Sequence, residues 1–230
     1  INTPACIQPN DQQDVRIVTD SKSGAIITWL DFRNDVNLLA GDIFVQRLDR
    51  NGIEKWTISG VALCNLATDQ TAPSIAEDGN GGAIIAWNDW RNGNRDIYAQ
   101  KVDSSGTVQW AANGISVVTK ANHQQDPKLI SDGAGGAIIV WQDSVSGPYD
   151  IYAQRVSSTG TVLWTSGGTA ICTAALTQVN SRIETDGAGG AIITWQDKRN
   201  GIDYDIYAQR INSSGVSQWA ANGLAICNAA

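Results

Sequence analysis

The stretch "GGAIIVWQDSVSGPYDIYAQRV", from Gly135 to Val156, decides the fold because the chain repeats it. Close copies begin at Gly81 and Gly189, and a weaker copy begins at Ser23. Each copy carries one tryptophan at the end of the "AII-x-W" run and a second after the "DIYAQ" segment, and these are Trp29, Trp87, Trp141 and Trp195, then Trp56, Trp110, Trp164 and Trp219. Successive tryptophans of one kind lie about 54 residues apart, a period that is typical of solenoids, propellers or arrays.

Each copy predicts four short strands separated by glycine-rich turns. The run Ala137–Trp141 is apolar at every position, whereas a strand with one wet face would alternate, so we expect it to be buried on both faces. A small sheet that is covered on both faces needs a similar sheet on either side, and such sheets arranged about an axis form a β-propeller. The sequence therefore predicts an all-β fold, a β-propeller of four blades with four antiparallel strands in each.

We expect the propeller to be one domain over residues 1–230, with residues 1–14 at the seam of the ring. The predicted blades cover approximately residues 15–72, 73–126, 127–180 and 181–230.

The four cysteines share one phase of the repeat, and they are Cys6, Cys64, Cys172 and Cys227. Equivalent points in different blades are too far apart for a disulfide, so Cys64 and Cys172 are expected to be free and buried. If the ring closes with four blades, Cys6 and Cys227 meet at the seam, and a Cys6–Cys227 disulfide would staple it.

The segment "DPKLISDGAGGAIIVWQD" followed by "YDIYAQRV" resembles the repeat of sialidase-like (BNR-type) propellers, as in bacterial secreted and surface repeat proteins. The sialidase Asp-box reads S-x-D-x-G-x-x-W, whereas the corresponding turn here is "DSSGTVQW", from Asp103 to Trp110. The resemblance implies the architecture rather than the activity, because a sialidase also needs an arginine triad and a tyrosine nucleophile with a partner glutamate.

The formal net charge of −7 argues against nucleic-acid binding, which needs a basic surface. No stretch approaches the roughly 20 apolar residues of a transmembrane segment. Few lysines, many small polar residues and four cysteines favour an extracellular or cell-surface location.

All variation in repeat length falls in the loop between the second and third strands. Such a loop either carries function on a rigid scaffold or simply tolerates length. Trp90 with its neighbouring arginines would stack on a sugar ring, or it caps its own hairpin. The candidate ligand-binding residues are Arg33, Leu38, Leu39, Trp90, Arg91, Arg95, Tyr149, Arg199 and Tyr204.

Several polar positions recur in every repeat. An aspartate follows each strand-ending tryptophan and either shapes the loop or joins a ring of carboxylates that binds Ca²⁺, and these are Asp31, Asp89, Asp143 and Asp197. Apart from this possible Ca²⁺, we expect no cofactor. A glutamine is expected to bridge adjacent blades, at Gln12, Gln70, Gln124 and Gln178. A cation is expected to pair with a carboxylate, at Arg47, Lys101, Arg155 and Arg210.

Catalytic motifs are missing from the sequence: His123 is the only histidine, and there is no serine-nucleophile, zinc or phosphate-loop signature. Carboxylates are plentiful, so a paired-carboxylate glycosidase stays open. We predict a non-enzymatic binding module for a glycan or protein surface, either monomeric or pairing into a larger ring. The alternatives are a sialidase-like glycan-processing enzyme and a structural repeat or assembly subunit.

Overall fold

The computed structural model describes residues 4–35, 40–145 and 147–227, which form sixteen β-strands and no helix. The strands make four antiparallel four-stranded sheets, which we number 1 to 4 along the chain. Sheet 1 contains β1 (Gln12–Thr19), β2 (Ala25–Asp31), β3 (Asp42–Leu48) and β4 (Val61–Cys64). Sheet 2 contains β5 (Gln70–Glu77), β6 (Ala83–Asp89), β7 (Asp96–Val102) and β8 (Ile115–Val118).

Sheet 3 contains β9 (Gln124–Ser131), β10 (Ala137–Asp143), β11 (Asp150–Val156) and β12 (Thr169–Cys172). Sheet 4 contains β13 (Gln178–Thr185), β14 (Ala191–Asp197), β15 (Asp205–Ile211) and β16 (Leu224–Cys227). Each sheet begins at one of the repeated glutamines, slightly before the boundary expected from the sequence. The predicted all-β propeller of four-stranded sheets is confirmed.

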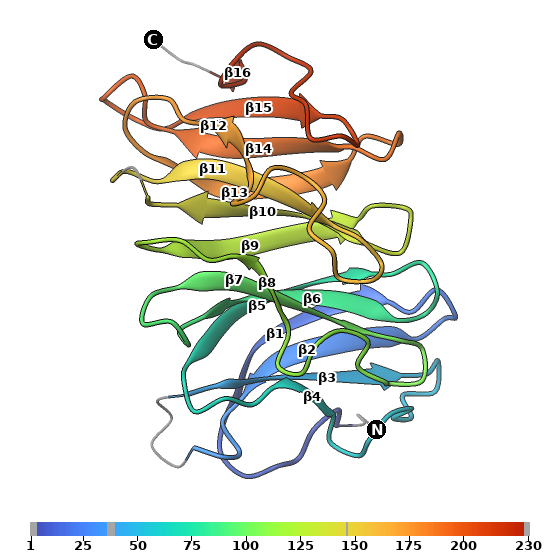
Figure 1. Ribbon diagram of the computed structural model, residues 1–230. Helices are drawn as coiled ribbons and strands as arrows, with labels where there is room; N and C mark the ends of the chain where they lie inside the picture. The colour runs from blue at the N-terminus through green and yellow to red at the C-terminus, as the bar shows by residue number, and fades with distance from the viewer. Residues whose placement is uncertain (1–3, 36–39, 146, 228–230) are drawn as a thin grey trace.

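The sheets stack face to face in chain order, with β5 packed between β1 and β9 and with β9 packed between β5 and β13 (Figure 1). The first strand of each sheet therefore lies innermost. No helix among the described residues has the length and apolar character needed to span a membrane.

The second strand of a sheet is buried on both faces because a sheet lies on either side of it. Every residue of β6 is buried. Ile85 packs into a cluster with Ile43 of sheet 1, whereas Ile84, the adjacent residue, packs into a cluster with Ile139 of sheet 3. Neighbouring residues of a strand point to opposite faces, so both faces must be apolar, which explains the uninterrupted apolar run.

Each seam between sheets is fixed by a tryptophan that follows the third strand. Trp56 Nε1 donates to the carbonyl of Ser104 in sheet 2 at 3.1 Å. The next two seams repeat this bond at the same distance, from Trp110 to Ser158 and from Trp164 to Ser213. Gly106 lies against the Trp56 ring, and a Cβ there would approach the ring to 2.6 Å.

The repeated cations form the ion pairs that the sequence predicts. Each binds an aspartate in its own sheet, in the pairs Arg47–Asp20, Lys101–Asp78, Arg155–Asp132 and Arg210–Asp186. Arg47 also donates to the carbonyl of Ser104 across the seam. The repeated glutamines lie at the connections between sheets, where the backbone N–H of Gln124 donates to the carbonyl of Arg95 in the preceding sheet.

The condition for the Cys6–Cys227 staple, a ring closed between sheets 1 and 4, is not met in this structure. Sheet 1 and sheet 4 lie at opposite ends of the stack (Figure 1). Cys6 and Cys227 are free thiols, so the Cys6–Cys227 disulfide is not formed. The buried, free state predicted for Cys64 and Cys172 is confirmed.

The packing of Trp56 on Gly106 gives a test of the seam. Gly106 and Gly93 have almost the same backbone, with φ of 87° and 88°, but nothing lies within 4 Å of a Cβ at Gly93. Both Gly→Ala changes cost about 1–2 kcal/mol of backbone strain. Gly106→Ala should cost a further 1–3 kcal/mol or so, because the methyl group meets the indole. Urea denaturation of the two variants measures the difference, and equal losses would contradict this account of the seam.

Candidate functional site

A buried aspartate ends the second strand of each sheet and organises the loop that follows. Asp89 is fully buried, and it accepts a bond from Trp87 Nε1 at 2.9 Å. Arg91 closes an ion pair with the same carboxylate at 2.6 Å and donates to the carbonyl of Asn113 at 2.7 Å. The arrangement recurs in sheets 1 and 4, around Asp31 with Arg33 and around Asp197 with Arg199.

The arginine hydrogen bonds determine the charge state of these carboxyl groups. Burial alone would raise the pKa of Asp31, but the bonds from Arg33 and Trp29 outweigh it and hold the pKa below its ordinary value. The pKa of Asp197 is lowered in the same way by Arg199 and Trp195. Asp31 and Asp197 are therefore ionised at neutral pH and have a structural role.

Sheet 3 lacks this arginine, and a lysine from the preceding sheet replaces it. The loop after β10 begins with Ser144 and Val145 where the other copies have an arginine. Lys120, which follows β8 of sheet 2, pairs with Asp143 at 3.2 Å and lies 4.3 Å from the centre of the Tyr152 ring. The sequence analysis missed Lys120 because the replacement comes from a different sheet.

Three predicted ligand-binding arginines make structural contacts within the fold, and their role toward a ligand stays a prediction. Arg33, Arg91 and Arg199 are held in the ion pairs described above, and each guanidinium lies over an aromatic ring of its own sheet, 3.9, 3.7 and 3.7 Å from the ring centre. These contacts brace the loop that follows the second strand.

The predicted ring of metal-binding aspartates is likewise not formed. In the described part of the chain, no three His, Cys, Asp or Glu side chains gather in an arrangement that could hold a metal ion. Each of Asp31, Asp89, Asp143 and Asp197 is paired with its own cation instead.

Trp90 and Arg95 form a contact at the seam between sheets 2 and 3. The Trp90 ring meets the His123 ring edge-on at 5.5 Å, and Arg95 lies 5.2 Å from the Trp90 ring centre. The backbone N–H of Arg95 donates to His123 Nδ1 at 3.2 Å, and its side chain donates to Gln125 Oε1 at 2.6 Å. These bonds of Arg95 therefore link the two sheets, whereas its buried Nε has no hydrogen-bond partner.

Of the remaining predicted ligand residues, the described Tyr149 and Tyr204 have separate partners. The carbonyl of Tyr149 accepts a bond from Gln178 at the next seam, and Tyr204 is exposed beside Lys198. Leu38 and Leu39 lie outside the described residues.

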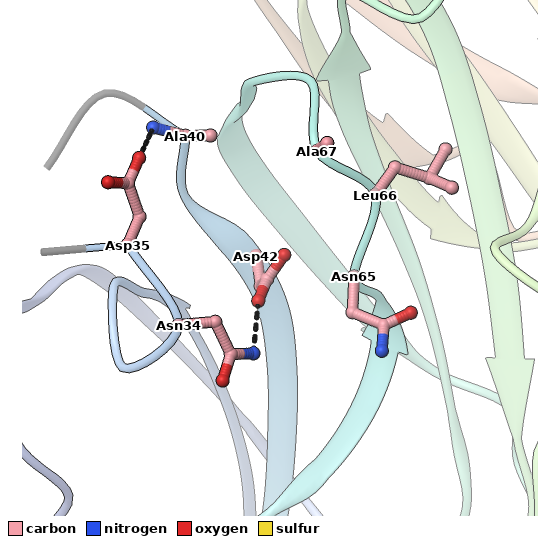
Figure 2. A pocket seen from close by; sticks show the side chains of 7 residues that line it. All are labelled: Asn34, Asp35, Ala40, Asp42, Asn65, Leu66 and Ala67. Atoms are coloured by element: carbon pink, nitrogen blue, oxygen red, sulfur yellow. Dashed lines mark hydrogen bonds between the residues drawn. The ribbon is translucent and has the colours of Figure 1, made fainter. Parts of the chain in front are cut away.

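A cavity of about 360 Å³ lies where the loop after β2 meets the connection between β4 and β5 (Figure 2). Asp42, the first residue of β3, is only 5% exposed and accepts a bond from Asn34 Nδ2 at 2.9 Å. Asp35 accepts a bond from the backbone N–H of Ala40 at 2.7 Å. The lining consists of Asn34, Asp35, Ala40, Asp42, Asn65, Leu66 and Ala67, so it contains two carboxyl groups and no cation.

Burial raises the pKa of Asp42 despite the opposing bond from Asn34, and the charges of Asp31 and Asp35 raise it further. The Asp42 carboxyl group therefore holds a proton at higher pH than an ordinary aspartate does. A carboxylic acid beside a second carboxylate is the arrangement that general acid–base chemistry uses.

Sheet 3 has an equivalent cavity with a different lining. Asp150 begins β11 as Asp42 begins β3, and it lines a space of about 400 Å³ with Tyr152 and Leu176. Among the described residues of that lining, Asp150 is the only one with a carboxyl group. Neither cavity could be seen in the strand pattern of the sequence, although the extra length of the first loop, which carries Asp35, was a signal for the first.

No protein-family model and no curated protein matches the chain. Among solved structures, it is similar to an endo-arabinase from Bacteroides thetaiotaomicron, with a TM-score of 0.55, 15% identity and coverage of 96% of this chain and 82% of that one. An α-L-arabinofuranosidase from Lactobacillus brevis matches with a TM-score of 0.51, 11% identity and coverage of 91% and 70%. An endo-1,5-α-L-arabinanase from Thermotoga petrophila matches with a TM-score of 0.51, 14% identity and coverage of 94% and 60%.

These likenesses support the fold, a β-propeller of repeats, and none of the three structures is named a sialidase. They also correct the prediction of a non-catalytic binding module that is not an enzyme. The three similar propellers carry the names of glycan-processing enzymes.

The buried ion pair of Asp197 predicts a pH-dependent stability. A carboxyl group whose pKa is lower in the folded state than in the unfolded state stabilises the fold at pH values above its unfolded-state pKa, which is about 3.9. This contribution is lost as the pH falls through the folded-state pKa. Asp197→Asn should lower the free energy of unfolding by about 3 kcal/mol at pH 7, because Arg199 loses its partner, and by less at pH 3, which is below the unfolded pKa of the carboxyl group. Urea titrations at both pH values test this, with the exposed Asp203→Asn as a control that changes stability by less than about 0.5 kcal/mol. A loss from Asp197→Asn that is equal at both pH values would contradict the role given to the ion pair.

Proposed function

We propose that this chain is a glycan-processing hydrolase that cleaves glycosidic bonds in neutral glycans, using Asp42 and Asp35. The observation that carries the proposal is the pair of carboxyl groups in one cavity, one of which is buried and has a raised pKa. The likeness to propellers named as arabinan-processing enzymes supports it at the level of the fold.

In this proposal the two carboxyl groups have different roles. Asp42, which holds its proton more tightly, protonates the glycosidic oxygen as the bond to the leaving group breaks. Asp35 acts on the other side of the sugar, as the base that activates water or as the nucleophile. Asn34 holds the Asp42 carboxyl group in place, and the backbone N–H of Ala40 holds that of Asp35.

The charge of the cavity favours a neutral sugar. No arginine or lysine is among the described lining residues, so an anionic sugar such as sialic acid would meet two carboxyl groups in this lining and no lining cation. A neutral pentose glycan of the arabinan kind fits this lining better. The sialidase-like type of the repeat is therefore retained only as a resemblance of sequence, and we keep an extracellular or cell-surface location as part of the proposal, since the substrate is a polymer.

Activity should depend on both carboxyl groups. We expect Asp42→Asn and Asp35→Asn each to lower kcat/KM on arabinan or an aryl arabinofuranoside by about 10² or more, because each removes a carboxyl group that acts in the chemical step. The matched control is Asp150→Asn, which alters the equivalent residue of sheet 3, where no second carboxyl group lines the cavity. This control should retain activity.

The assay panel should include a sialoside beside the neutral substrates. Hydrolysis of the sialoside alone would overturn the proposed substrate class. Failure to hydrolyse any of the glycans, or equal losses in Asp42→Asn and Asp150→Asn, would overturn the proposed site.

A further inference from the structure

The outer face of sheet 4 is apolar but uncovered. Ile206 is 38% exposed and Ile226 is 62% exposed. In the first three sheets the residues equivalent to Ile206 are fully buried against the next sheet, and they are Ile43, Ile97 and Ile151. The residues equivalent to Ile226 are 2–4% exposed, and they are Leu63, Val117 and Ile171. Sheet 4 thus exposes the same apolar surface that sheets 1, 2 and 3 each bury against the next sheet.

The polar groups of this face are also unused. Trp56, Trp110 and Trp164 each donate Nε1–H to a serine carbonyl of the next sheet, but within the described residues Trp219 Nε1 has no acceptor. Cys64 and Cys172 contact the aspartate of the next sheet at 3.8 and 3.7 Å, whereas Cys227 is exposed. Sheet 4 therefore carries the donor groups of a seam, but the described residues supply no following sheet to accept their bonds.

Sheet 1 presents the opposite half of a seam. Ile17 of β1 is 64% exposed, whereas its equivalents in the other sheets are at most 9% exposed, and they are Ile75, Leu129 and Ile183. Cys6 already lies at the place that a preceding sheet's fourth strand would fill, with Sγ 3.7 Å from Asp31 Oδ2 and 3.3 Å from the Arg33 guanidinium. These distances match those at the Cys64 and Cys172 seams.

The space between the two faces is limited. Val18 of sheet 1 lines the same cavity as Glu184 and Thr185 of sheet 4, so the innermost strands of both sheets converge on one axis. The similar endo-arabinase propeller leaves about a fifth of its chain unmatched, which is about the length of one repeat here. Both observations fit a space between sheets 4 and 1 that holds one further sheet, and they do not fit a space that holds four.

We propose that a further sheet of the same repeat, supplied by an additional polypeptide segment, docks between sheets 4 and 1. The face formed by its first and second strands covers Ile206 and Ile226. A backbone carbonyl in the turn after its third strand accepts the hydrogen bond from Trp219 Nε1. It contributes three strands, because Cys6 occupies the position of the fourth. A second copy of this chain, with four sheets, would meet sheet 1 of the first copy before it could continue around the axis.

The experiment extends the full chain at its C-terminal end with a copy of residues 176–219. This join keeps the six-residue spacing from Cys227 to the copied Gln178, the same spacing that separates Cys172 from Gln178. Thermal unfolding, amide hydrogen exchange at β16 and molar mass by light scattering are measured for the parent and the extended chain. We expect the extension to raise Tm by about 5–10 °C, to slow exchange at β16 and to leave a monomer.

Two variants of the extended chain make the result specific. Ile226→Asp places a charge on the docking face and should abolish the gain, whereas Ile202→Asp, at a residue 83% exposed in the loop after β14, should preserve it. The proposal is overturned if the extension gives no gain, or if the gain survives Ile226→Asp. A parent chain that is already dimeric with β16 protected would also overturn it, because the second copy would then be the occupant.

Discussion

The structure depends on strands that have no polar face. The residues of β6 and β10 are buried throughout, so a sheet that contains such a strand is stable only with apolar neighbours on both sides. Stacking satisfies this requirement for sheets 2 and 3, and the seam bonds of Trp56 and its equivalents align each sheet on the next. The terminal sheets keep one uncovered face each, which is where the exposed Ile17 and Ile226 lie.

Much of the architecture could be predicted from the sequence because it is local to each repeat. The apolar run Ala137–Trp141 predicts a doubly covered strand, and the pairing of Arg47 with a carboxylate follows from its position in every copy. The closure of the ring could not be predicted, because the rotation from one sheet to the next depends on side chains packed at the axis. Repeated sequence specifies that the faces match, but not how many sheets complete a turn.

The candidate site was harder to predict for a related reason. Arg33, Arg91 and Arg199 are polar residues in a variable loop, which is typical of ligand binding, yet their charges are neutralised by aspartates two residues away. The cavity around Asp42 requires a loop of sheet 1 and the connection to sheet 2, segments that a strand pattern does not bring together. Burial, which raises the pKa of Asp42, is a property of that assembly.

Uneven covering of the sheets is the central claim, and native-state amide hydrogen exchange tests it most directly. The account predicts that β6 and β10, each covered on both faces, exchange only through global unfolding, and that β14 and β16 exchange faster through local opening of sheet 4. Equal protection of the second strands of all four sheets in a monomer would contradict it, because sheet 4 would then need no neighbour on its outer face.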